Sequence, residues 1–355
     1  MHQQYFQEHV QRIDHELTKY LNSRSLTIAQ EYPKLQPLIQ ELVIANQGGK
    51  RLRAVLVILW YEMITGYHND DLIPVALAYE LFQTGILAHD DIIDASDLRR
   101  GKSTLHKAIE VRGWSLGLSS LKSAHYGVSH SICLADIAMF LANKIIMDSK
   151  LTSDIKVLAS QCFIQSCIDT GLGEMLDVEM EHIDSSMITE SDIISMYRNK
   201  TAHYTITGPL LLWAICAWAD EETCKGIKIF GDNLGIAFQI KDDEIGIYQD
   251  ESVSGKSATS DIEEGKYTLL YHHAMTYGTA DQITQLSAVY GHKVTSIQHQ
   301  QIKQLLEQTW SKAYNEQQIQ HYVSQSLEYI NYLTPHPAYR EYLSQLASFM
   351  INRTK

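Results

Sequence analysis

The chain has 355 residues and carries 29 basic against 42 acidic side chains, a net charge of −13 at pH 7. Proteins that coat nucleic acid have the opposite sign of charge, so binding to a phosphate backbone is not expected to be the main activity. Glycine and proline make up about 7% of the chain, well below the usual ~12%. So few turn-forming residues argue against a β-sandwich, a collagenous chain or a disordered protein.

Apolar residues recur with helical spacing from one end of the chain to the other. The first 21 residues are a polar amphipathic pattern without the basic-then-apolar order of a signal peptide. Leu52, Val55, Leu56 and Leu59 then follow the i, i+3, i+4, i+7 spacing of a helix that faces a core. Similar stripes predict helices over 72–94, 127–148, 153–183, 190–219, 221–248, 265–278, 298–332 and 336–352.

Three stretches interrupt this pattern, at 95–104, at 112–126, which is rich in Gly and Ser, and at 249–265, which is polar and charged. None of them is a hydrophilic linker that would divide the chain. Long helices joined in this way predict an all-α fold in which residues 1–355 form a single large helical bundle.

The five cysteines are odd in number and have no CxxC spacing, so we expect reduced, mostly buried thiols rather than disulfides or a zinc site. The longest strongly apolar run, 209–219, is about half of the ~20 residues that a membrane span needs. We therefore expect a cytoplasmic protein with no membrane span.

An acidic run, Asp90-Asp91-Ile92-Ile93-Asp94, stands at the end of an apolar helical stretch. Asp90 and Asp94 are four residues apart and so lie on one face of the helix, with Asp91 beside them. Like charges repel, and acidic groups are unfavourable at a helix C-terminus. A solvated helix end is the alternative, but two unfavourable effects at one place indicate a bound cation.

A second acidic run, Asp242-Asp243-Glu244, ends another long apolar stretch. Carboxylates without His or Cys in the motif suit Mg²⁺ better than zinc. Because Mg²⁺ usually binds through one or two carboxylates together with substrate phosphates, the pattern indicates a diphosphate ligand. Basic residues that could bind it cluster where the helical pattern breaks: Lys50, Arg51, Arg53, Arg99, Arg100, Lys200, Lys256 and Lys266.

These motifs together resemble the trans-isoprenyl diphosphate (polyprenyl) synthases. The matching segments are GGKRLR at 48–53, DDIID with RRGKSTLH within 90–106, KT at 200–201, FQIKDD at 238–243 and GKSATSDIEEGK at 255–266. Their order and spacing agree from about residue 40 to 270, which makes the resemblance specific although each motif alone is weak. It implies an all-α bundle around a central cavity, and a homodimer.

The resemblance also implies roles for individual residues. Asp90, Asp94 and Asp242 would bind Mg²⁺, with Asp91 and Asp243 in support, and together with Lys200 the first three would be catalytic. The allylic diphosphate would be held by Arg99, Lys200, Thr201, Gln239, Lys256 and Lys266. Isopentenyl diphosphate would be held by Lys50, Arg53 and Arg100. The expected reaction condenses the two diphosphates into a longer trans-polyprenyl diphosphate.

Two positions depart from the family's pattern. Gln83 stands where many members have His, and can still donate a hydrogen bond to phosphate. Gly246 stands where the second motif commonly has a carboxylate, which we interpret as a variant of the site.

Product length is expected to depend on residues that precede the first motif. Ile86, Gly85 and Phe82 lie four, five and eight positions before Asp90, on the path expected for the growing chain. Gly85 would leave room and Phe82 could form a floor, or be simply a core residue. The hypothesis is a geranylgeranyl product.

Four alternatives compete with a geranylgeranyl synthase. A purely structural bundle would have no need of acidic i, i+4 pairs together with basic loops. A longer-chain synthase uses the same motifs. A class I terpene cyclase has no need of the isopentenyl site, and its second metal motif is absent from 242–250. A non-catalytic subunit of a heteromeric synthase typically loses the acidic and basic motifs that this chain keeps.

Overall fold

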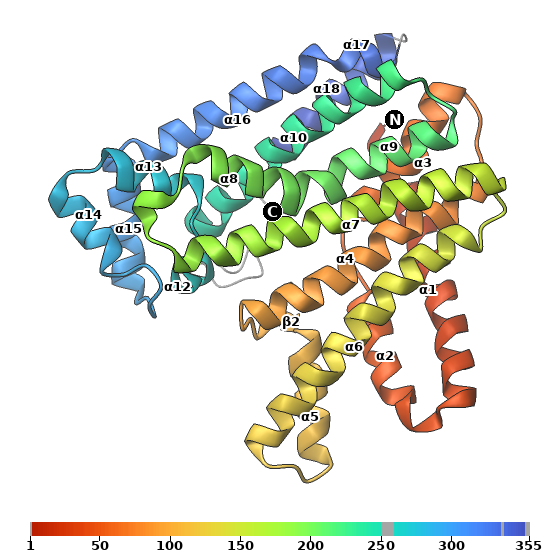
Figure 1. Ribbon diagram of the computed structural model, residues 1–355, viewed down its shortest axis with the longest axis horizontal. Coiled ribbons are helices and arrows are strands. Elements are labelled where there is room, and N and C mark those ends of the chain that lie inside the picture. The colour runs from red at the N-terminus through yellow and green to blue at the C-terminus, as the bar shows by residue number, and fades with distance from the viewer. Residues whose placement is uncertain (1, 250–258, 335–336, 352–355) are drawn as a thin grey trace. The chain divides into compact units, whose positions relative to one another are not determined.

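A computed structural model gives the structure of residues 2–249, 259–334 and 337–351 (Figure 1). Almost every described element is a helix, which confirms the predicted all-α class. Within those ranges the strands are the two-residue pair β1 (Leu98–Arg99) and β2 (Lys102–Ser103), which form an antiparallel hairpin.

The chain divides into two compact units, which are described separately. The first comprises Met1–Ile164 and Leu212–Trp218, and the second comprises Gln165–Leu211 and Ala219–Lys355. The prediction of one domain stays a prediction. Helices α7 (Ser153–His182) and α9 (Gly208–Cys216) belong partly to each unit.

The first unit begins with the long helix α1 and contains a second long helix, α6. Besides the β1–β2 hairpin and its parts of α7 and α9, its elements are α1 (His2–Glu31), η1 (Pro33–Leu35), α2 (Gln36–Ala45), α3 (Leu52–Thr65), η2 (Asp70–Leu72), α4 (Ile73–Ile93), α5 (Leu105–Ser115) and α6 (Ser120–Met147). Helix α4 lies beside α6 (Figure 1). Side chains of α2, α4, α5 and α6 form a buried apolar cluster that supports the C-terminal end of α4.

The Gly- and Ser-rich stretch 112–126 interrupts the helices less than the sequence predicts. Helix α5 continues to Ser115 and α6 begins at Ser120, so the break is only four residues long. The glycines flanking this turn let the two helices approach closely. A Cβ atom at Gly113 would lie 2.9 Å from Cα of Ser123, and one at Gly127 would overlap the carbonyl oxygen of His106.

The second unit is built around α10 (Glu221–Tyr248), which packs along α16 (Ser311–Glu328). Figure 1 shows these two helices side by side. The remaining elements are η3 (Ser185–Met187), α8 (Glu190–Tyr197), η4 (Arg198–Thr207), α12 (Ser260–Glu264), α13 (Leu269–Tyr277), α14 (Ala280–Ser287), α15 (Ser296–Gln308), α17 (Ile330–Leu333) and α18 (Pro337–Ile351).

Two long helices expected from periodicity are divided in the structure. The expected helix 190–219 consists of α8, a ten-residue π-helix, η4, and α9. The expected helix 298–332 is broken because Trp310 adopts a left-handed conformation (φ 61°) between α15 and α16. The segments on either side of each break still have helical apolar spacing, so the sequence pattern does not reveal either break.

Two other expectations concern the state of the cysteines and the absence of a membrane span. All five cysteines are free, as predicted. The expectation that most are buried is wrong: Cys216 is buried, Cys133 is exposed on α6, and the other three are half-buried. Within the described residues, Asp70–Ile93 and Ser120–Met147 are long and apolar enough to cross a membrane. Core helices pass the same test, so neither helix establishes a membrane span.

Candidate active site

The first acidic motif lies at the C-terminal end of α4, in the first unit. The backbone N–H of Asp94 donates to the carbonyl oxygen of Asp90 at 2.8 Å, so the two residues are one helical turn apart, as predicted. Asp90 and Asp91 are 8% and 4% exposed. Two carboxylates this buried need a positive partner, because burial and mutual repulsion both oppose their negative charge.

Arg99, on strand β1, is that partner in the structure. Its guanidinium donates to Asp90 Oδ2 and to Asp91 Oδ1, each at 2.6 Å. Burial opposes the positive charge, but the charges of Asp90 and Asp91 prevail and raise the pKa of Arg99 above its ordinary value. This carboxylate pair therefore holds a cation.

Three predicted isopentenyl-site residues lie in the same unit: Lys50 in the loop before α3, Arg53 in the first turn of α3 and Arg100 in the β1–β2 turn. A Cβ atom at Gly49 would lie 3.0 Å from Nη1 of Arg100, so the Arg100 side chain packs directly over the diglycine that precedes Lys50. Partial burial lowers the pKa of Arg100, and the charges of Arg99, Arg53 and Arg51 lower it further. Several cations thus converge on one place, which favours an anion there.

The second acidic motif lies one turn before the C-terminal end of α10, in the second unit. There, three predicted residues form a hydrogen-bonded chain. The Thr201 hydroxyl donates to Gln239 Oε1 at 2.6 Å, and Gln239 Nε2 donates to Asp243 Oδ1 at 2.7 Å. The Tyr197 hydroxyl donates to the other oxygen of Asp243 and accepts from the Leu269 N–H at 2.9 Å. These contacts fix the orientation of a buried carboxylate.

The surroundings of Asp243 disfavour the charged form of its carboxyl group. Burial raises the pKa of Asp243 to about 8, and repulsion from Asp261 and Asp242 adds to this effect. The hydrogen bonds from Tyr197 and Gln239 oppose the shift. Asp242, by contrast, is exposed at the end of α10. Of the two neighbouring carboxylates, Asp243 is therefore buried and hydrogen-bonded, and Asp242 is accessible.

Lys200 has two acidic partners that the sequence analysis did not identify. Its Nζ lies 3.1 Å from Glu174 and 2.5 Å from Asp177, both buried on α7. The i, i+3 spacing of these carboxylates in an apolar helix is a signal of the kind that identified the first motif, and could have identified them.

The π-helix η4 holds Lys200 and Thr201 against α7 and α10, and glycines make this contact possible. A Cβ atom at Gly173 would lie 2.5 Å from Cα of Lys200, nearer still to its backbone nitrogen. A Cβ atom at Gly231 would lie 2.8 Å from Cα of Thr207, and one at Gly235 would overlap Ala202. π-Helical turns are rare and frequent at functional sites.

Gly246 stands where a carboxylate was expected, and the carboxylate of another residue lies beside it. A Cβ atom at Gly246 would overlap the carboxylate oxygen Oδ2 of Asp261, which comes from α12. The absence of a side chain at this position thus makes room for an acidic group from another element. Lys266 lies nearby in the chain and pairs with Glu264 at 3.1 Å, whereas Lys256 lies outside the described residues.

The predicted chain-length residues lie along α4. Phe82 is 2% exposed and packs edge-on against Phe163, with ring centroids 5.8 Å apart, while Gln83 and Ile86 are half-buried. The space beside Gly85 differs from the expectation. A Cβ atom there would lie 2.8 Å from the Ala135 carbonyl oxygen, so Gly85 serves the close packing of α4 on α6 rather than leaving room.

Both acidic motifs offer the hard oxygen ligands that Mg²⁺ prefers. In the first unit, Asp90 and Asp91 already bind a guanidinium between them, which fits a site for a cation. Within the described parts of the chain, no three His, Cys, Asp or Glu side chains form a ready metal cluster. Mg²⁺ bound there would therefore need further ligands.

Comparison with known proteins shows the family to which the chain belongs. A sequence model of the polyprenyl synthetase family matches residues 35–309. The short chain isoprenyl diphosphate synthase of Methanocaldococcus jannaschii is 29% identical over 301 residues, 84% of this chain and 80% of the relative. The geranylgeranyl diphosphate synthase of Sulfolobus acidocaldarius is 29% identical over 294 residues, 82% of this chain and 80% of the relative.

Solved structures give the same result. The geranylgeranyl pyrophosphate synthase from Corynebacterium glutamicum, complexed with isoprenyl diphosphate and magnesium, has a TM-score of 0.90 at 28% identity. The likeness covers 97% of this chain and 98% of that one. The chain therefore belongs to the polyprenyl synthetase family. It is a trans-prenyltransferase of isoprenoid biosynthesis, as the sequence motifs predict.

Proposed function

We propose that the protein uses Mg²⁺ to condense isopentenyl diphosphate with an allylic diphosphate, and that its main product is geranylgeranyl diphosphate. The observation that supports this best is in the first unit. There Arg99 is held by Asp90 and Asp91, while Arg51, Arg53 and Arg100 converge beside it. Paired carboxylates next to converging cations suit a metal-bound diphosphate beside a second diphosphate.

The proposed roles follow the predicted residues. Asp90, Asp94 and Asp242 would hold Mg²⁺, and Lys50, Arg53 and Arg100 would hold the diphosphate of the isopentenyl substrate. Lys200 and Thr201 would hold the allylic diphosphate, with Gln239 and Asp243 fixing the Thr201 hydroxyl through their hydrogen bonds.

The residues act mainly by stabilising charge. Bound Mg²⁺ supplies a Lewis acid for the negative charge that develops on the departing diphosphate. Arg99 in the first unit would add positive charge at the departing diphosphate, so that the allylic C–O bond breaks and the diphosphate leaves with the electron pair. The double bond of the isopentenyl substrate then forms the new C–C bond, and a proton is lost to complete the step. No side-chain nucleophile is required.

Geranylgeranyl diphosphate is one of several products for which the relatives of this chain are named. These relatives include geranylgeranyl synthases, a geranylfarnesyl synthase of Aeropyrum pernix and an octaprenyl synthase of Escherichia coli. Within this chain, buried Phe82 is the candidate for the residue that limits product length, and its ring packs edge-on against Phe163. Phe82→Ala should lengthen the product, and an unchanged product would remove Phe82 from this role.

We also propose that the protein is a cytoplasmic homodimer. Free cysteines suit a reducing compartment. In the first unit, α6 has exposed apolar side chains, among them Leu121 (84% exposed) and Phe140 (77%), which a second copy of the chain could cover. Sedimentation of the purified protein tests this directly.

The activity is tested with purified protein, labelled isopentenyl diphosphate and each allylic primer, with and without Mg²⁺. The proposal predicts a 20-carbon product only when Mg²⁺ is present. A longer product would replace the proposed chain length, a cyclised hydrocarbon would indicate a cyclase, and no product with any primer would indicate a non-catalytic subunit.

A further inference from the structure

Helix α1 packs on the first unit with one continuous buried stripe. His9, Ile13, Leu17 and Leu21 follow each other at four-residue spacing and are 6%, 0%, 1% and 3% exposed. The helix contacts α2, α3 and α4. All of these α1 residues precede 35–309, the part of the chain that the family model matches.

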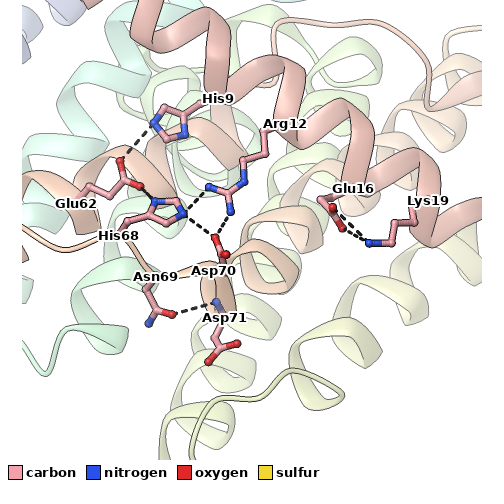
Figure 2. Close-up of polar contacts among 9 residues, drawn as sticks. All are labelled: His9, Arg12, Glu16, Lys19, Glu62, His68, Asn69, Asp70 and Asp71. Atoms are coloured by element: carbon pink, nitrogen blue, oxygen red, sulfur yellow. Dashed lines mark hydrogen bonds and ion pairs between the residues drawn. The ribbon is translucent and has the colours of Figure 1, made fainter.

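Near its C-terminal end, helix α3 is linked to α1 by a cluster of ion pairs (Figure 2). His9 of α1 lies 3.3 Å from Glu62 near the end of α3. Arg12 pairs with Asp70 in η2, and the ring of His68 lies between Glu62 and Asp70. These contacts set the position of α1 along α3.

At the start of α3, the residue between the proposed diphosphate ligands is strained. Arg51 lies between Lys50 and Arg53 and has a left-handed backbone (φ 50°, ψ 28°). That conformation is unfavourable for a non-glycine residue and persists only where its surroundings hold it. Its side chain is only 6% exposed, so the holding contacts are within the fold.

Three groups hold the Arg51 guanidinium. Nε donates to Asp14 Oδ1 at 2.6 Å, Nη2 donates to the carbonyl oxygen of Asn46 at 2.5 Å, and Nη1 donates to Glu80 Oε2 at 3.3 Å. The second oxygen of Glu80 accepts from the Ala54 N–H, one of the free donors at the start of α3. Arg51 thus joins α1, the end of α2 and α4 at the point where α3 begins.

We infer that Asp14, through Arg51, is a positioning residue for the isopentenyl diphosphate site. Arg51 is one of the cations that lower the pKa of Arg100, so it lies in a group of like charges that repel each other. The carboxylates of Asp14 and Glu80 offset this repulsion and hold the strained backbone between Lys50 and Arg53. The inference rests on the proposed function, because it takes Lys50 and Arg53 as ligands of that diphosphate.

The test compares Asp14→Ala with Glu16→Ala. Glu16 is a matched control: it lies on the same helix, two residues away, and bonds to Lys19 of α1 itself (Figure 2). For Asp14→Ala we expect KM for isopentenyl diphosphate to rise about tenfold, ~1.4 kcal/mol, with KM for the allylic primer within about twofold. Asp14→Asn keeps an acceptor for Arg51 and should fall between Asp14→Ala and the wild type.

Two outcomes would overturn the inference. One is an unchanged KM for isopentenyl diphosphate in Asp14→Ala. The other is an equal rise of both KM values with a lower Tm, which would show that α1 only stabilises the fold. Lys50→Ala and Arg53→Ala separate this from the proposed function. If they raise KM for isopentenyl diphosphate and Asp14→Ala does not, only the inference fails; if they do not raise it, the proposed site itself is wrong.

Discussion

Replacing Gly173 with alanine tests whether close packing of the π-helix positions Lys200. The new Cβ atom would stand 2.5 Å from Cα of Lys200 and closer still to its backbone nitrogen. Ordinary contact begins at 3.4 Å, so the Lys200 backbone must move by more than about 0.9 Å. Backbone of one helix facing backbone of another cannot relieve such a contact by a rotamer change. A displacement of about 1 Å in an active site can reduce the rate about 100-fold.

The same helix offers a control. Gly171 is two residues away on α7, and a Cβ atom there would meet nothing within 4 Å. Both substitutions gain the higher helix propensity of alanine, up to about 1 kcal/mol. Only Gly173→Ala adds an overpacking cost of about 1–3 kcal/mol.

We therefore expect Gly171→Ala to be as active as the wild type and slightly more stable. Gly173→Ala should lose about 100-fold in kcat and have a lower free energy of unfolding. Steady-state kinetics with a saturating primer and urea unfolding measure both quantities. Equal activity of the two variants would refute the view that the Gly173 contact sets the position of Lys200.

Two further predictions concern other positions. Gly246→Ala should displace the carboxylate of Asp261 and raise the Mg²⁺ concentration needed for half-maximal activity, and a Mg²⁺ titration with an unchanged midpoint would contradict this. Burial raises the pKa of the Cys216 thiol to about 12, so in the folded protein at pH 8 this thiol stays protonated and should resist alkylation. Exposed Cys133 should be modified first, as peptide mass spectrometry would show, and earlier labelling of Cys216 would be evidence against the buried environment.

Sequence reasoning succeeded where chemistry is encoded in short spacing. The i, i+4 pair Asp90 and Asp94 lies on one helical turn, as expected. Thr201, Gln239 and Asp243, chosen through the family resemblance, are joined by hydrogen bonds. In the first case one helix brings the residues together, and in the second the residues were found because the order of motifs resembles that of the family.

It was less successful where position depends on packing between elements. The π-helix η4 has no signature in the apolar pattern. Gly85 suggested free space because a missing side chain can mean either a cavity or a close contact, and here the carbonyl oxygen of Ala135 fills the space. Arg51 was named only among the basic residues that could bind a diphosphate. Its contacts with Asp14 and Glu80 were not predicted, because these partners are distant in sequence.

The central claim is that the paired carboxylates bind magnesium. Its most direct test compares Asp90→Ala with the wild type in a prenyltransferase assay, with circular dichroism as a control for folding. If paired carboxylates bind the magnesium that lets diphosphate depart, the variant should keep its helical spectrum and lose about 100-fold or more of the rate. Full turnover by Asp90→Ala, or wild-type turnover that persists in excess EDTA, would contradict the account.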